Sequence, residues 1–271
     1  MAKKAKPSKQ NKHRTIHVSP VDSSLERIGQ YLVQGDYPGV VATCERVLRS
    51  LPRHARQRAE VLAHLGTAQG LLQNFPQSYA AFTEALALDP KDAQLWYNRS
   101  MACRFTSRFG QALRDMERAI ELNTSRELAE QFEEALQFSR QLAEESMRRR
   151  GPNFTLEQLI EQENHFQHGL EWMEAGEWEQ AEYAFQASIA MGDCLPQPWG
   201  NLGICLLMQE RYDEAQAALQ RALEIDPKYA LAKNNLAALP EARRAGPPRR
   251  VALNEPFKHS KLKHSITFIK E

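Results

Sequence analysis

Two histidines three residues apart are the nearest approach in this chain to a set of metal ligands. His165 and His168 would share one face of a helix, with Glu161 one turn before them and Glu171 one turn after. Imidazole and carboxylate groups at this spacing can bind zinc or a similar divalent cation. Histidines also serve as core or boundary residues, and we favour that interpretation. The sequence therefore predicts neither a metal nor a cofactor.

The motifs of common catalytic sites do not occur in the sequence. It contains no phosphate-binding glycine loop, no H-E-x-x-H, no G-x-S-x-G and no cysteine/histidine cluster with ligand spacing. Adjacent carboxylates such as Glu133 and Glu134 diverge on a helix, and we interpret them as solvated surface. Because no nucleophile, base and orienting group can be assembled, we expect a non-enzymatic protein.

Cysteine usage and hydropathy point to the cytoplasm. Cys44, Cys103, Cys194 and Cys205 are far apart in the chain, and no C-x2-C pair suggests zinc or a redox dithiol. We expect them to be reduced. No apolar run approaches the roughly 20 residues of a membrane helix, and the lysine-rich N-terminus lacks the apolar segment of a secretory signal. We therefore expect a cytoplasmic protein without a membrane partner.

Charge is divided along the chain although the net charge is +1. Residues 1–14 carry +6 and residues 240–271 carry +5, and subtracting both from +1 leaves the middle at −10. Basic tails can bind nucleic acid by releasing counterions, so an RNA- or ribosome-associated factor is an alternative function. Against it, the body is acidic, and lysine-rich termini also serve as plain solubilising tails. Nucleic acid is therefore possible but not favoured as a partner.

The chain is organised by a repeated order of large and small residues, which is clearest from Pro198 to Asn235. Small residues in such an order let two antiparallel helices approach while large ones fill the gaps between them. The ordered positions are Trp199, Leu202, Gly203, Tyr212, Ala215, Leu219, Ala222 and Pro227. This pattern resembles the tetratricopeptide repeat, a unit of about 34 residues with W-x2-L-G in its first helix.

The resemblance implies an all-α fold, a solenoid of antiparallel helix pairs. Weaker copies of the pattern begin near residues 21, 59, 93 and 162, and the segment after the third copy has only one long helical stripe. We therefore expect two short arrays, in contact and joined by a long helix. The expected parts are a disordered basic tail at 1–20, a first array of three repeats at 21–126, a linking helix and turn at 127–155, a second array of two repeats plus a capping helix at 156–239, and a basic tail at 240–271.

Local signals predict where several helices begin and end. Ser23, Thr124 and Thr155 each stand three residues before a glutamate or glutamine, as in a capping box. Pro240 is expected to end the last helix. Near the C-terminus, Ser265 to Ile269 is β-branched and aromatic, so it is expected to pair as a strand or to fold on contact.

The resemblance also implies a binding groove on the concave side, which the first helix of each repeat forms. Asn98, Asn201 and Asn235 recur at one position of the unit, where an amide suits the main chain of an extended peptide. The surface around them is apolar and contains methionine, which suits a hydrophobic segment. The predicted peptide-binding residues are His64, Tyr97, Asn98, Arg104, Phe166, Gln167, Asn201, Met208, Asn234 and Asn235.

These observations predict an adaptor or scaffold that binds a peptide or an apolar protein segment, with its oligomeric state left open. Phe105, Leu170 and Ile204 have an equally good interpretation as packing residues between helices. Some members of the family hold a partner's C-terminal carboxylate with lysine and arginine, but the matching positions here contain neither. We therefore do not expect an acidic C-terminal tail as ligand, and we expect binding first in the second array.

Overall fold

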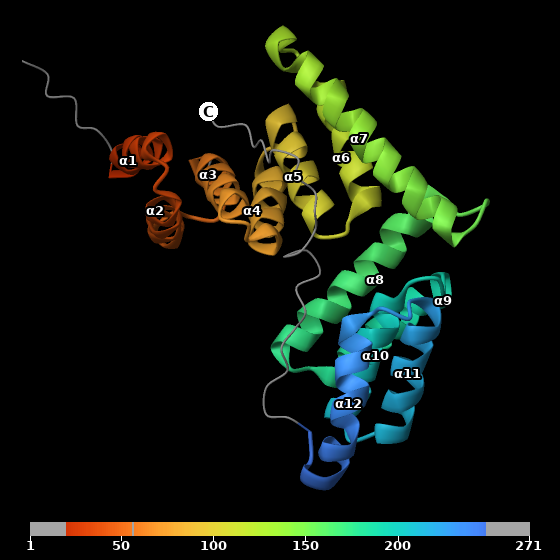
Figure 1. Ribbon diagram of the computed structural model, residues 1–271. Helices are drawn as coiled ribbons and strands as arrows, with labels where there is room; N and C mark the ends of the chain where they lie inside the picture. Colours follow the sequence, from red (N-terminus) through yellow and green to blue (C-terminus); the bar gives the residue numbers. More distant parts are fainter. Residues whose placement is uncertain (1–19, 56, 248–271) are drawn as a thin grey trace, which may run out of the picture.

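The computed structural model describes residues 20–55 and 57–247, and these residues form twelve α-helices. The two helices of each pair run antiparallel, and the pairs stack on one another (Figure 1), so the predicted all-α solenoid is confirmed. None of these helices combines the length and the apolar character that crossing a membrane requires. The helices are α1 (Pro20–Gln34), α2 (Tyr37–Ser50), α3 (Gln57–Leu71), α4 (Phe75–Leu88), α5 (Ala93–Phe105), α6 (Phe109–Leu122), α7 (Arg126–Arg150), α8 (Leu156–Ala175), α9 (Trp178–Met191), α10 (Pro196–Met208), α11 (Tyr212–Ile225) and α12 (Ala230–Ala245).

Small residues let the two helices of a pair approach closely, as the repeated pattern predicts. A β-carbon on Gly66 would lie 2.8 Å from the ring of Phe82, and one on Gly203 would lie 2.6 Å from Leu219 Cγ. In the third pair Ser100 replaces glycine, and its buried hydroxyl donates to a carbonyl oxygen of α6 at 2.9 Å. Because this hydroxyl is hydrogen-bonded across the pair, the helices stay close without glycine.

Each of the five helix pairs turns through one residue in the left-handed backbone region. These residues are Gly35, Gln73, Ser107, Gly176 and Glu210, with φ between 57° and 77°. Glycine adopts this conformation without strain, whereas a residue with a side chain pays roughly 1–2 kcal/mol. The two arrays therefore share one turn geometry although their turn sequences differ.

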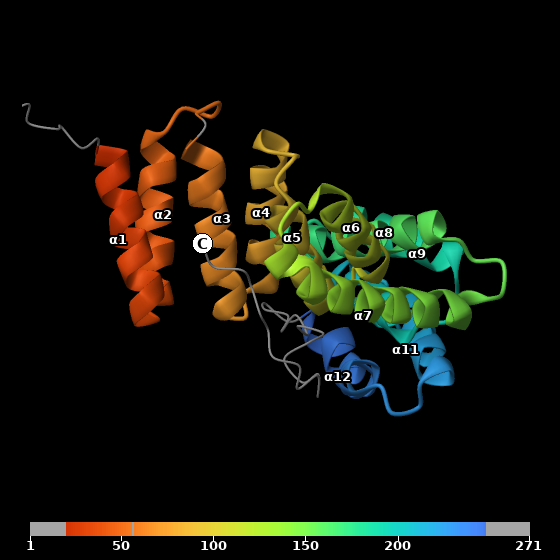
Figure 2. The same cartoon turned by 90° about the horizontal axis from the view of Figure 1, so that it is seen from above.

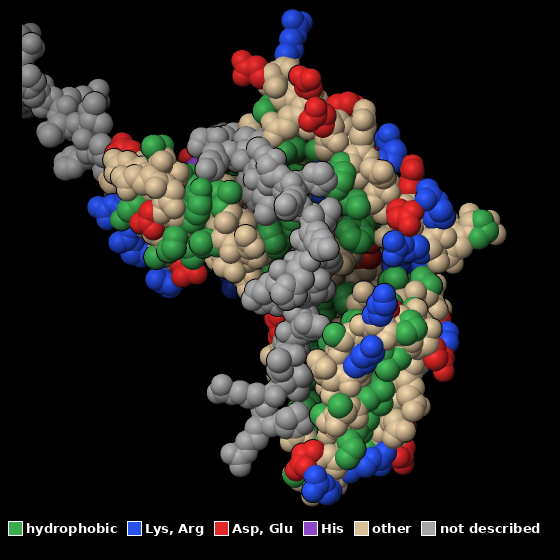
Figure 3. All heavy atoms as spheres, viewed as in Figure 1, with side chains coloured by type: hydrophobic (Ala, Val, Ile, Leu, Met, Phe, Trp, Pro, Cys, Tyr) green, Lys and Arg blue, Asp and Glu red, His purple; other side chains and the backbone are tan. Residues whose placement is uncertain are grey.

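Each array ends on a single helix that covers its last pair. Helix α7 packs on α6 and touches α5, in the way that α5 packs on α4 and touches α3. Helix α12 packs on α11 and α10 in the second array. The long helix predicted after the third repeat is confirmed, since α7 has 25 residues. Acidic and basic side chains alternate along its outer edge (Figure 3), so its outer side is solvated while Phe132 is buried on its inner side.

Helix α8 takes part in both arrays. Leu159 in its first half lies in the core of the first array, whereas Met173 in its second half lies in the core of the second. Figure 2 shows α1 to α6 side by side in chain order, and α8 contacts α6 at the end of this row. The two arrays are thus in contact, and one helix joins their cores.

Two helices begin at other residues than the capping signals predict. Helix α1 begins at Pro20, so Ser23 lies inside the helix and is not its N-cap. Proline suits a first turn because its fixed φ is helical and no N–H is needed there. Helix α7 has Ser125 at its N-cap in place of Thr124. The side chain of Asn123 accepts a hydrogen bond from the Ser125 N–H at 2.9 Å and so shapes this turn.

The last helix runs past the proline that was expected to end it. Helix α12 continues through Pro240 to Ala245, which moves the start of the basic tail beyond residue 240. Ala242 is buried against the second array, and Arg243 makes an ion pair of 2.6 Å with Asp213. These contacts hold the last turn. The carbonyl left without a partner by the missing N–H of Pro240 can bond to water, because that side of the helix is exposed.

The capping box at Thr155 is confirmed. Its hydroxyl accepts from the N–H of Gln158 at 3.2 Å, and the Gln158 side chain accepts from the N–H of Thr155 at 2.9 Å. The predicted disordered tail before Pro20 and the predicted strand from Ser265 to Ile269 lie outside the described residues.

Candidate functional site

Two of the predicted peptide-binding residues, His64 and Asn98, line one pocket between α3 and α5. The pocket has a volume of about 170 Å³. Helices α3 and α5 are the first helices of successive pairs, so the pocket lies between helices of the kind expected to form the groove. The rest of its lining consists of Ala59, Glu60, Ala63, Thr67, Asp89, Asp92, Gln94 and Leu95.

Residues at the ends of three helices bring carboxylates to this pocket. Asp92 is the N-cap of α5, and its carboxylate accepts from the N–H groups of Gln94 at 2.8 Å and Leu95 at 3.3 Å. Asp89 is the C-cap residue of α4, and Glu60 lies in the first turn of α3. Acidic residues favour helix N-termini because they complement the helix dipole. The beginnings of α3 and α5 and the end of α4 thus bring three carboxylates to one pocket.

The pocket is negatively charged. Glu60, Asp89 and Asp92 line it, and its described lining contains no lysine or arginine. Burial lowers the pKa of His64, so its imidazole is neutral at pH 7 and does not offset the carboxylates. A cationic group in the pocket would be stabilised by the three carboxylates. The alanine and leucine side chains of the lining suit the apolar stem of a lysine.

Tyr97 and Arg104 face α7. The Tyr97 ring stacks on Phe132 with 4.9 Å between centroids, and its hydroxyl accepts from Gln131 Nε2 at 2.8 Å. The guanidinium carbon of Arg104 lies 5.0 Å from the ring centroid of Phe138. Nε and Nη2 of Arg104 are buried without a hydrogen-bond partner in the structure, and this burial lowers the pKa of Arg104 to about 10. Both side chains pack α5 against its neighbour.

The predicted residues of the second array have separate surroundings. The Phe166 ring packs on Phe185 with 5.7 Å between centroids. Asn201 is buried, with 7% of its surface exposed. The amide of Asn235 donates to the carbonyl of Leu231 in its own helix at 2.9 Å.

Gln167, Met208 and Asn234 also lie apart from one another. Gln167 donates to the carbonyl of Thr106 at 2.6 Å and accepts from Arg108 at 2.9 Å, so it bonds to the turn between α5 and α6. Met208 is half-buried against the core of the second array, and Asn234 is exposed on α12. A role for these residues in binding stays a prediction.

A buried carboxylate joins the two arrays. Glu163 on α8 is 4% exposed and accepts from the N–H groups of Phe109 at 2.9 Å and Gly110 at 3.0 Å, the first residues of α6. Burial raises the pKa of Glu163 to about 8, although the two N–H groups and the cations of Arg150 and Arg108 favour the charged form. Glu163 thus caps a helix of the other array.

Glu163 was not among the predicted site residues, because a glutamate in a helix has the pattern of a solvent-exposed residue. One signal was available in Gly110, which stands in the first turn of α6. A β-carbon there would lie 2.7 Å from Ile160 Cγ1, so only glycine lets α8 dock so closely. Beside this contact is a pocket of about 240 Å³. Arg150, which lines it, already donates to Gln162 and to the carbonyl of Ser146.

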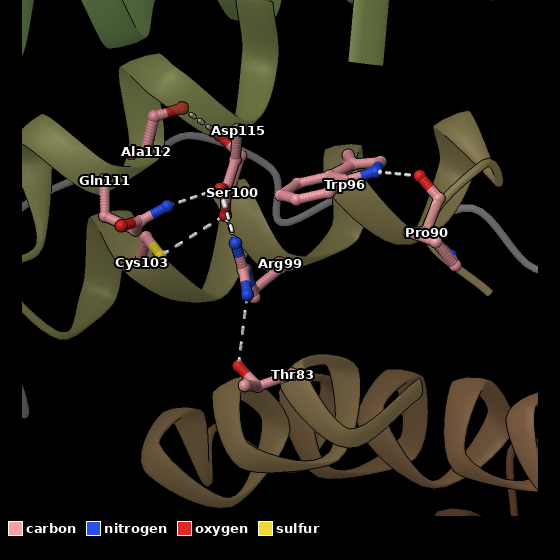
Figure 4. Close-up of polar contacts among 9 residues, drawn as sticks. All are labelled: Thr83, Pro90, Trp96, Arg99, Ser100, Cys103, Gln111, Ala112 and Asp115. Atoms are coloured by element: carbon pink, nitrogen blue, oxygen red, sulfur yellow. Dashed lines mark hydrogen bonds and ion pairs between the residues drawn. The ribbon is translucent and has the colours of Figure 1, made fainter. Parts of the chain in front are cut away.

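A buried ion pair that the sequence reasoning also missed ties α5 to α6. Arg99 and Asp115 share two hydrogen bonds of 2.7 Å, and Gln111 donates to Asp115 at 2.6 Å (Figure 4). The guanidinium of Arg99 also lies 4.9 Å from the ring centroid of Trp96 and reaches Thr83 on α4 at 3.5 Å. Because these groups point at one another, we interpret the ion pair as a structural link within the third helix pair, and Arg99 also reaches the second pair through Thr83.

The candidate metal ligands do not form a site in the described residues. His165 and His168 line a surface pocket with Trp172 and Tyr183. No group of three or more histidine, cysteine, aspartate or glutamate side chains in the described part of the chain could hold a metal ion. Cys44 is buried, which raises the pKa of its thiol to about 12 and keeps it protonated.

Family models identify the repeats. One model of the tetratricopeptide repeat matches residues 196–229, and a second matches residues 64–127. The chain therefore contains tetratricopeptide repeats. The matched residues lie in both arrays and include His64 and Asn98 of the acidic pocket. Tetratricopeptide repeats indicate a protein–protein interaction adaptor, and proteins built from them are generally non-enzymatic scaffolds.

Three known proteins are similar to this chain over part or most of its length. The peroxisomal targeting signal receptor of Yarrowia lipolytica is 34% identical over 80 residues, a match that covers 29% of this chain but only 13% of the receptor. The TPR domain of P58(IPK) is 12% identical with a TM-score of 0.46, covering 83% of this chain and 66% of that chain. A thermophilic TPR protein from Thermus thermophilus is 22% identical with a TM-score of 0.34, covering 82% of this chain and 99% of that chain.

Proposed function

We propose that this chain is a non-enzymatic adaptor that binds an extended, basic segment of a protein partner on the inner face of its first array. The observation that carries the proposal is the acidic pocket between α3 and α5. A lysine or arginine of the partner would enter among Glu60, Asp89 and Asp92. The partner's main chain would then pass Asn98, which also lines the pocket.

The size and charge of the pocket set the expected mode of binding. A volume of about 170 Å³ holds one side chain, so the rest of the segment would lie along α3 and α5. Glu60 and Asp89 are exposed, so each ion pair with the partner is expected to add no more than about 1 kcal/mol. Binding is therefore expected to be modest in affinity and to weaken with salt.

The test uses the full chain and short peptides that differ only in having lysine or glutamate at the same positions. The lysine peptides are expected to bind and the glutamate peptides are not, because the pocket is negatively charged. Glu60→Lys is expected to weaken binding about tenfold, which corresponds to 1.4 kcal/mol. The matched control is Glu117→Lys, since Glu117 is exposed on α6 and lines none of the described pockets. Equal binding of both peptide sets would contradict the proposal.

The alternative partner is nucleic acid, bound by the basic tails. Most of these tails lies outside the described residues. The described residues carry 22 lysines and arginines against 32 aspartates and glutamates, which disfavours a nucleic-acid surface on the helices. This alternative predicts an association that survives Glu60→Lys and is lost when residues 1–14 and 248–271 are removed.

A further inference from the structure

We propose that residues 256–271 of this same chain bind the acidic pocket between α3 and α5 and compete there with an external partner. The inference rests on the proposed function, because it uses the same pocket. It goes further by naming an occupant that every molecule carries. Binding of a partner would then require displacement of this segment.

Charge complementarity is the first argument. Residues 256–271 read PFKHSKLKHSITFIKE, with four lysines against one glutamate. The pocket presents Glu60, Asp89 and Asp92, and lysine and arginine are absent from its described lining. Opposite charges on the two surfaces favour their association and set its orientation.

The order of residues in the segment is the second argument. In an extended chain alternate side chains point the same way, so Lys261 and Lys263 would both face the carboxylates, with one of them inside the pocket. The residues that follow, Ser265 to Ile269, are β-branched and aromatic, which favours an extended conformation and supplies apolar contacts. The N-terminal tail is a poorer candidate. Residues 1–14 are more basic, with +6 against +3, but methionine is their one large apolar side chain.

The length of the tether is the third argument. Residue 247 is the last one described, two residues beyond the end of α12. Residue 262 follows 15 residues later, and an extended chain of that length reaches up to about 50 Å. Figure 1 shows α12 in the second array, which α8 joins to the first array. The extended tether is thus longer than α8 itself, which has 20 residues and is about 30 Å long.

Tethering makes even weak binding effective. A segment linked to its own site has an effective concentration on the order of 1 mM. If the separate peptide binds with a Kd of about 0.1 mM, the linked segment lowers the apparent affinity of any competitor about tenfold. The pocket would therefore be mostly occupied in the absence of a partner.

The experiment measures binding of a fluorescent peptide with the sequence of residues 256–271 to the full chain. Lys261→Glu with Lys263→Glu removes the linked competitor, so this double variant is expected to bind the peptide about tenfold more tightly than the wild type. Adding Glu60→Lys to the double variant is expected to abolish that gain. Adding Glu117→Lys instead, as a matched control, is expected to leave the gain intact.

The remaining outcomes decide between this inference and the proposed function. Equal affinity of the wild type and the double variant would overturn the inference. A scrambled peptide that binds the double variant as tightly as the native peptide would also overturn it, while leaving a general preference for basic peptides. Loss of binding for both peptides would reject the two proposals together. If the competition became stronger at higher protein concentration, the segment would be binding the pocket of a second copy of the chain. That result would overturn the linked arrangement.

Discussion

The inner faces of the two arrays use the same position of the repeat in different ways. Asn98 in the first array and Asn201 in the second are both buried, with 4% and 7% of their surface exposed, but Asn98 lines a pocket with carboxylates. Asn235 bonds to its own helix. The neighbouring helices cause the difference. In the first array the N-terminal ends of α3 and α5, which carry Glu60 and Asp92, line the same pocket. In the second, the inner helix α8 is hydrogen-bonded to the start of α6 through Glu163 and to the turn before α6 through Gln167.

A side chain can point toward the inner face of an array without being available to bind a partner. The position in the repeat predicts that a residue points toward the inner face, because helix geometry is the same in every unit. Whether the side chain can bind a partner depends on what already contacts it. The second array was the expected place for binding, and the structure moves our proposal to the first.

The largest expected effect comes from the equivalent core phenylalanines of the two arrays. Phe82 and Phe185 are both completely buried, so Phe82→Ala and Phe185→Ala are each expected to cost about 3–5 kcal/mol of stability. Because Leu159 and Met173 of α8 join the two cores, each variant is expected to destabilise both arrays. Hydrogen exchange of α3–α4 and of α9–α11 in both variants measures this. Protection of α3–α4 that is unchanged in Phe185→Ala would show that the arrays unfold separately.

The hydrogen bonds of Glu163 at the junction between the arrays are expected to contribute less to stability than a core phenylalanine does. Glu163→Ala leaves the N–H groups of Phe109 and Gly110 buried without an acceptor, which is expected to cost about 1–3 kcal/mol. Denaturant unfolding measures the loss. Glu161→Ala is a suitable control, because Glu161 is exposed on the same helix. A loss of equal size in the control would contradict a special role for the buried carboxylate.

The same carboxylate predicts how stability depends on pH. The pKa of Glu163 is about 8 in the folded chain against an ordinary value of 4.5, so the folded state binds this proton more tightly than the unfolded state. The contribution of Glu163 to stability is therefore expected to fall as pH rises from about 4.5 to about 8. Glu163→Gln is expected to flatten this part of the profile. A profile unchanged by Glu163→Gln would contradict the assignment.

Substitutions of the asparagines test which of the two arrays binds the peptide. Asn98→Ala is expected to weaken binding of lysine-bearing peptides about tenfold, or 1.4 kcal/mol, because an amide beside the carboxylates would be lost. The double variant Asn201→Ala with Asn235→Ala is expected to bind as the wild type does. Fluorescence anisotropy of the labelled peptides measures both. The reverse result would return the binding site to the second array.

The smallest expected effect concerns the turns that both arrays share. Glu210 adopts φ of 63°, so Glu210→Gly is expected to relieve strain and raise stability by about 0.5 kcal/mol after the entropy cost of glycine. Gly176→Ala in the same array is the matched opposite change, and it is expected to lower stability by about 1 kcal/mol. Thermal unfolding of the two variants measures the difference. Shifts of the same sign would show that these turns are not strained.

Features that depend on residues close in the chain were predictable. The close contact of Gly203 with Leu219 follows from small and large residues at fixed spacing within one pair. The capping box of Thr155 involves groups three residues apart, so its two hydrogen bonds could be expected. Pro240 shows the limit of such rules, since tertiary contacts of Ala242 and Arg243 keep the helix intact beyond it.

By itself, the sequence determined the all-α repeat architecture, the long α7 and the helices that form the inner face, because side-chain spacing acts within each helix pair. The tertiary structure alone decided which inner residues share a pocket and which bond elsewhere. Gln167 bonds to Thr106 61 residues away, and Glu163 bonds to Phe109 54 residues away. No local pattern encodes such pairs. They form because burying α8 against α6 brings polar groups together that must find partners away from water.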